Sequence, residues 1–106
     1  MKPKELLVSE SEWTIIQNIL NNNLIYQQVF AFGSRVSGQP KKFSDLDLLI
    51  KDSLEVGQEK LAALAEEFSE SDLPYRVDLV LFSEISDSFK KIIEEKYILI
   101  FPLSIA

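Results

Sequence analysis

The stretch GSRVSGQPKKFSDLDLLI, residues 33–50, decides the fold predicted for this chain. The apolar run VFAF, residues 29–32, leads into it and predicts a strand that ends at a Gly-Ser turn. A short polar loop follows, and then Asp45 and Asp47 alternate with leucine at the start of a second predicted strand. This order suits a site that holds the phosphates of a nucleotide at the turn and divalent metal at the carboxylates.

Three aspartates are the candidate catalytic residues and metal ligands. Asp45 and Asp47 project from the same face of an extended strand, with Cα atoms about 6.6 Å apart at roughly 3.3 Å per residue. Asp78 lies inside a second apolar run, VDLVLF, residues 77–82, where a lone buried charge is costly. If the two runs form neighbouring strands, the three carboxylates share one patch, and their repulsion calls for two metal ions. Each acid taken alone also fits a solvated strand end or a hydrogen-bonded buried carboxylate.

The turn at residues 33–38 carries the candidate nucleotide-binding residues. Gly33 has no Cβ, so its backbone can approach a ligand closely or adopt a positive φ. Ser34 offers a hydroxyl and a backbone N–H at the start of a short predicted helix, a position that favours phosphate. Arg35 is the nearest cation and suits phosphate oxygens or the acids of a partner, with a surface ion pair as the alternative. The glycine spacing matches neither a Walker loop nor the dinucleotide-binding fingerprint.

The composition limits the chemistry that the chain can support. It has no cysteine and no histidine, so disulfides, zinc hydrolase sites and Cys-His or Ser-His nucleophile pairs are excluded. Metal must then be held by oxygen, which favours Mg²⁺, with Mn²⁺ or calcium as alternatives. The net charge of −6 disfavours direct binding of long nucleic acid. It suits a small anion that arrives paired with metal, or a basic protein partner.

Length and hydropathy predict a single domain over residues 1–106. No apolar run approaches membrane-spanning length and the N-terminus has no signal-peptide pattern, so we expect no membrane association and a cytoplasmic location. A domain of this size has a modest stability margin, to which a partner or a second copy of the chain would add by covering apolar surface.

Besides the short helix at the turn, two longer helices are predicted before the third aspartate. Ser9 and Glu12 fit a capping box for the first, which ends at the asparagine run 21–23. The second begins near Ser53 or Gly57 and carries an apolar stripe at helical spacing.

The last third of the chain completes the predicted fold. Residues 75–82 are apolar on both faces and predict a central strand, a helix follows over 83–96, and residues 97–101 predict an edge strand. Leu103 and Ile105 fit either the core or an apolar patch for a partner. The fold class is therefore α/β (α+β), a small mixed sheet of three to four strands flanked by helices.

These motifs resemble the signature of the DNA polymerase β-like nucleotidyltransferase superfamily. The resemblance rests on the Gly-Ser-Arg turn that ends at Gly38, on the Ser-Asp-Leu-Asp-Leu run over 44–48, and on Val-Asp-Leu at 77–79. It covers roughly residues 29–82. The small size and the Phe-Gly-Ser-Arg form are most similar to the minimal nucleotidyltransferases, the MNT proteins, and imply the nucleotidyltransferase fold.

The resemblance implies transfer of a nucleoside monophosphate, AMP from ATP, to an acceptor hydroxyl with release of pyrophosphate. Gly33 and Ser34 would then hold the triphosphate, with Arg35 beside them. Asp45 and Asp47 would ligate two magnesium ions, and Asp78 would ligate the catalytic ion and help to deprotonate the acceptor.

MNT proteins are often paired with a HEPN-domain protein in two-gene toxin–antitoxin modules. There the MNT protein is the antitoxin and can adenylylate a hydroxyl on the HEPN ribonuclease toxin. Larger members of the superfamily add a substrate-binding domain, for which this chain has no room, so the acceptor must come from a partner or from a second subunit of a homo-oligomer.

Three hypotheses stay open. The leading one is an active, magnesium-dependent nucleotidyltransferase that modifies a HEPN-type partner. The second is a non-catalytic binding module that neutralises its partner by occlusion. The third is a protein that binds nucleotide or metal without turnover.

Overall fold

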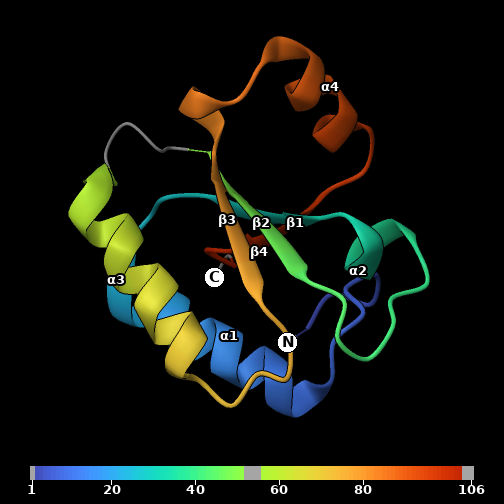
Figure 1. Cartoon of the computed structure of the whole chain (residues 1–106), viewed down its shortest axis with the longest axis vertical. Coiled ribbons are helices and arrows are strands. Elements are labelled where there is room, and N and C mark those ends of the chain that lie inside the picture. Colours follow the sequence, from blue (N-terminus) through green and yellow to red (C-terminus); the bar gives the residue numbers. More distant parts are fainter. Residues whose placement is uncertain (1, 52–55, 104–106) are drawn as a thin grey trace.

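The computed structural model describes residues 2–51 and 56–103 (Figure 1). Its elements, in chain order, are α1 (Glu10–Asn23), β1 (Val29–Phe32), α2 (Ser34–Ser37), β2 (Leu46–Ile50), α3 (Gly57–Glu70), β3 (Val77–Leu81), the 3-10 helix η2 (Phe82–Glu84), α4 (Asp87–Glu95) and β4 (Ile98–Phe101). The predicted class, a small mixed sheet flanked by helices, is confirmed. Ser53 and Ile105 lie outside the described residues, and the assignment of the chain to one domain stays a prediction.

The four strands form one sheet in the order β3-β2-β1-β4. Strand β1 pairs antiparallel with β2 and with β4, whereas β2 and β3 run parallel. The expected edge position of the last strand is confirmed, but the expected central position of the third is wrong, because β3 lies at the opposite edge. Its apolar content has another cause. Val77 and Leu79 pack on the main core, while Val80 stands level with the fully buried Leu49 on the other face.

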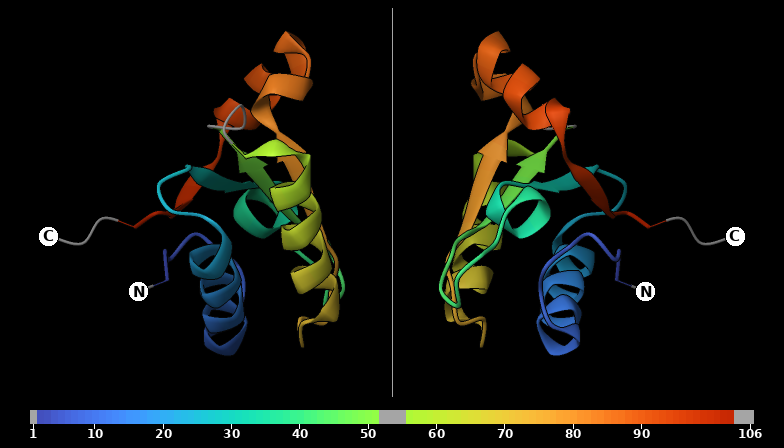
Figure 2. Two further views of the ribbon diagram at one scale, coloured as in Figure 1. Left: turned by 90° about the vertical axis from the view of Figure 1, so that its left-hand side faces the viewer. Right: turned by 90° about the vertical axis from the view of Figure 1, so that its right-hand side faces the viewer.

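The main core lies on the face of the sheet that α1 and α3 cover. Leu46, Leu48 and Ile50 of β2 are fully buried in it. Helix α4 lies at the opposite end of the molecule from α1 (Figure 2). The alternation of β2 therefore directs Asp47 and Leu49 to the other face, where α4 approaches.

The first helix forms as its capping signal predicts. The Ser9 hydroxyl accepts a hydrogen bond from the Glu12 N–H at 3.1 Å, and the Ser9 N–H donates to the Glu12 carboxylate at 3.0 Å. Trp13, Ile16 and Leu20 then fall on one buried face. Within the described residues, no helix is long and apolar enough to cross a membrane.

Candidate active site

Asp47 and Asp78 lie at neighbouring positions on adjacent strands. They are register partners in the parallel pair of β2 and β3, so both carboxylates project from the face opposite the main core. Directly paired residues of neighbouring strands are separated by about 4.8 Å. Asp47 is half-buried and Asp78 is exposed. The predicted approach of the second and third acids is therefore present in the fold.

The charges of the three acids act on one another. The pKa of Asp47 is raised to about 6, first by burial and then by the negative charges of Asp78 and Asp45. Within the described residues, no hydrogen bond or ion pair engages the carboxylates of Asp47 and Asp78. A carboxyl in this position gains stability from a cation, because a cation offsets both the burial and the repulsion.

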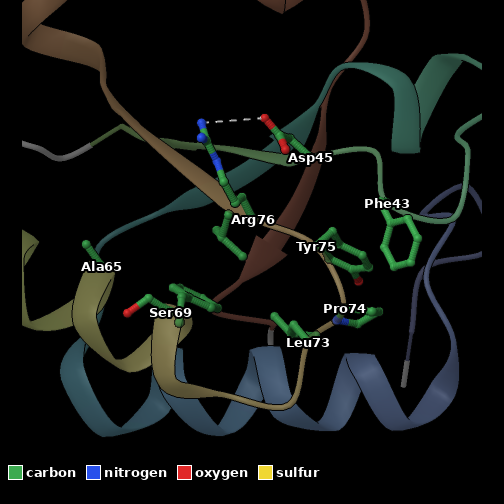
Figure 3. A pocket seen from close by; sticks show the side chains of 10 residues that line it. Phe43, Asp45, Ala65, Ser69, Leu73, Pro74, Tyr75 and Arg76 are labelled. Atoms are coloured by element: carbon green, nitrogen blue, oxygen red, sulfur yellow. Dashed lines mark ion pairs between the residues drawn. The ribbon is translucent and has the colours of Figure 1, made fainter.

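The predicted three-carboxylate metal site is not assembled in this side-chain arrangement. Over residues 2–51 and 56–103, no group of three acidic side chains lies close enough together to hold a metal ion. Asp45 instead faces Arg76, with its carboxylate oxygen 3.9 Å from the guanidinium nitrogen (Figure 3). Both side chains are exposed, so this pair is weak and can rearrange. The donor set still fits magnesium, because it consists of carboxylate oxygens alone.

Gly33 brings the turn directly against the acids. It has a φ of 80°, in the region that favours glycine, and a Cβ built on it would overlap Oδ2 of Asp47. Ser34 follows as the first residue of α2, half-buried and with no hydrogen bond to its hydroxyl in the described part of the chain. Gly33 therefore lies against the half-buried acid, and Ser34 follows it in the turn.

Arg35 differs from the expectation that it binds nucleotide or a partner. Its side chain is only 5% exposed and stacks on the ring of Tyr75 at 3.8 Å. The guanidinium donates hydrogen bonds at 3.0–3.3 Å to four backbone carbonyls, those of Leu7, Lys41, Lys42 and Ser44. These carbonyls take four of the five guanidinium donors, so Arg35 holds the loop before β2 in place.

Arg76 is a site residue that sequence reasoning missed. Its side chain is 84% exposed beside Asp45, on the rim of a cavity of about 690 Å³ between the sheet and α3 (Figure 3). Apolar residues, among them Phe68 and Leu73, line that cavity below the rim. The spacing in the sequence could have revealed it. Arg76 precedes Asp78 by two residues, as Asp45 precedes Asp47, and residues two apart in a strand share a face.

Comparison with known proteins shows which family this chain resembles. The family model described as "Polymerase beta, Nucleotidyltransferase" matches residues 14–104. A relative from Haemophilus influenzae, named "Probable protein adenylyltransferase MntA", is 43% identical over 101 residues, which cover 91% of this chain and 84% of the relative. A solved structure entitled "Crystal structure of the toxin-antitoxin with AMP-PNP" shares the fold, with a TM-score of 0.69 and 22% identity over 87% of this chain and 74% of that one.

Proposed function

The chain belongs to the polymerase β nucleotidyltransferase family and is a nucleotidyltransferase, and from that premise we propose that it transfers AMP from ATP to a hydroxyl of a partner protein. We propose that the partner is a HEPN-domain toxin and that the chain acts as its antitoxin. The relative that is 43% identical over most of both chains is named a probable protein adenylyltransferase, which supports the class of acceptor. A second copy of the chain is the alternative source of the acceptor.

One observation carries the proposal. Asp47 and Asp78 are paired in register, with Gly33 against Asp47 and no protein cation bound to either acid in the described residues. Transfer of a nucleotidyl group depends on positioning and on neutralised charge more than on covalent help from the protein. A pair of unengaged carboxylates beside a glycine turn is suited to that task.

The acids have distinct positions in the proposed site. Asp47 and Asp78, joined by Asp45, would hold magnesium, which when bound offsets the charge of the carboxylates and of the phosphates. Asp45 becomes available when it leaves its exposed partner Arg76. Gly33 lets the polyphosphate approach the backbone closely, because no Cβ stands in the way.

The proposed reaction forms one bond and breaks one. The acceptor oxygen bonds to the α-phosphorus of ATP, and the bond from that phosphorus to the oxygen that bridges to the β-phosphorus breaks. The electron pair of the broken bond leaves with pyrophosphate. The proton of the acceptor hydroxyl passes to the carboxylate of Asp78, the exposed acid of the pair, or to water.

Label transfer tests the proposed function. The protein is incubated with magnesium, ATP labelled at the α-phosphate and a candidate HEPN-domain partner, and label on the partner is measured. We expect Asp47→Asn to lower the rate at least about a thousandfold, because the loss of metal-held charge amounts to several kcal/mol at about 1.4 kcal/mol per tenfold.

Asp72→Asn is the matched control, because Asp72 is an exposed acid in the turn after α3. This variant should transfer AMP at the wild-type rate. Normal transfer by Asp47→Asn would remove that residue from the chemistry. Full neutralisation of the partner by a variant that lacks Asp45, Asp47 and Asp78 would favour occlusion over transfer.

A further inference from the structure

A second cavity opens beside the acids on the side of α4. Its volume is about 470 Å³, within the range of pockets that bind small molecules. Its walls come from the end of β1, the turn that begins α2, and the face of α4 that carries Phe89 and Ile92. In Figure 1, α2 follows directly after the end of β1, and α4 lies above it in this view.

The cavity and the acids share a wall. Phe32, which lines the cavity, is the register partner of Asp47 across β1 and β2, so the two side chains lie next to each other on one face. Gly33 also lines the cavity, and its Cα lies against the carboxylate of Asp47. A ligand that has its phosphates at Gly33 and the acids can therefore extend directly into this space.

The chemistry of the cavity suits the uncharged part of a nucleotide. Phe32 and Phe89 meet edge to face with ring centroids 6.1 Å apart. Ile92 is 63% exposed, although it is a large apolar residue in the middle of α4. Glu95 and Lys96 add polar groups at the end of the helix. Apolar walls with a few hydrogen-bonding groups are typical of sites that bind flat heterocycles.

We propose that this cavity holds the nucleobase and ribose of the nucleoside triphosphate, with Ile92 as an apolar contact of the base. The assignment rests on the proposed function and adds to it the residues that bind the nucleoside. The larger cavity beside Asp45 is less suitable, because neither Gly33 nor any residue of α2 lines it. The apolar side chains of Phe32, Phe89 and Ile92 suit the base, and Lys96 is the one cationic side chain among the described residues that line the α4 cavity.

Calorimetric titration of Ile92→Asn tests the assignment. Asparagine keeps the charge of the protein unchanged, and the high exposure of Ile92 predicts an unchanged melting temperature. We expect binding of ATP with magnesium to weaken about tenfold, because a good apolar contact in a pocket has at least that effect. Binding of inorganic tripolyphosphate with magnesium should not change, because it has no nucleoside.

Ile25→Asn is the matched control, since Ile25 is 84% exposed in the loop before β1 and does not line the cavity. It should bind both ligands as the wild type does. Unchanged affinity of Ile92→Asn for ATP would overturn the assignment, and so would an equal loss for tripolyphosphate. Wild-type protein that binds ATP no more tightly than tripolyphosphate would also overturn it. The titrations contain no partner, so a failure to transfer AMP bears only on the proposed function.

Discussion

At the scale of single residues, the site depends on the contact between Gly33 and Asp47. The turn can lie against the acid because glycine adopts a φ of 80° there and has no side chain. Gly57, at the start of α3, has a similar φ of 74°, but a Cβ there would meet open space. The two glycines thus separate the effect of backbone conformation from the effect of contact with the acid.

We predict that Gly33→Ala destabilises the fold by about 2–4 kcal/mol, because it combines backbone strain with overlap on Asp47. Gly57→Ala should cost only about 1 kcal/mol, for the strain alone. Urea unfolding of the two variants measures both values. Equal losses would show that the contact between Gly33 and Asp47 has no energetic effect.

Asp47 should make the stability of the metal-free protein dependent on pH. Its pKa is raised from 3.8 to about 6, so the folded state holds its proton more tightly than the unfolded state does. The contribution of Asp47 to stability is therefore full below about pH 4 and is lost as the pH rises through about 6. Asp47→Asn, which has no proton to lose, should be more stable than the wild type above pH 6 and gain little at pH 4.

Thermal melting in EDTA at pH 4 and at pH 7.5 measures this difference. Asp72→Asn, a change at an exposed acid, should show no gain that depends on pH. A gain for Asp47→Asn that is the same at both pH values would contradict the account, because it would not arise from titration.

At the scale of elements, Arg35 joins three segments around the site. Its bonds reach the N-terminal segment at Leu7 and the loop at Lys41, Lys42 and Ser44, and its guanidinium stacks on Tyr75 before β3. The Tyr75 hydroxyl in turn donates to the Glu12 carboxylate at 3.0 Å, which connects this cluster to α1. Arg35 thus holds the loop that leads to Asp45 against the N-terminal segment and α1.

Arg35→Lys should destabilise the protein by about 2–4 kcal/mol, because one ammonium group cannot replace the guanidinium at all of these carbonyls. Arg76→Lys is the control, since that exposed side chain should change stability by no more than about 0.5 kcal/mol. Guanidinium chloride unfolding of both variants gives the comparison. A stable Arg35→Lys protein with lowered affinity for ATP would instead support direct binding of nucleotide by Arg35.

Local signals were enough to predict several elements but not their order in space. The capping box of Ser9 and Glu12 acts within one turn, so the sequence shows it directly. Strand order depends on long-range pairing, and the apolar run of β3 indicated burial without indicating an edge. The hydrogen-bond partners of Arg35 lie up to 28 residues away and its stacking partner Tyr75 lies farther along the chain, so its burial had no local signal. The neighbouring positions of Asp47 and Asp78 followed once the two strands were taken as adjacent.

At the scale of the whole molecule, a cluster of side chains around Lys51 connects α4 to the sheet. The Lys51 ammonium donates to the Tyr97 hydroxyl at 3.1 Å, pairs with Glu94 at 3.4 Å and lies over the ring of Phe30 at 5.4 Å. These contacts tie β2 to α4 and to the segment before β4. They therefore link the helix that lines the proposed nucleoside cavity to the end of β2.

The charge of the whole chain is consistent with a protein acceptor. A net charge of −6 opposes the approach of long nucleic acid and favours a basic partner surface. Asp78 is exposed on the face away from the main core, and Asp45 is exposed at the rim of the cavity beside α3. The cytoplasmic location and a homo-oligomeric state stay predictions.

The most direct test of the account is the intact mass of a HEPN-domain protein, the partner proposed for this chain, after co-expression with it. With the wild-type chain, we predict that the partner gains the mass of one or more AMP groups, and that it gains none with Asp78→Asn. A partner of unchanged mass that is nevertheless neutralised, or one that gains the same mass with Asp78→Asn, would contradict nucleotidyl transfer at the paired acids of β2 and β3.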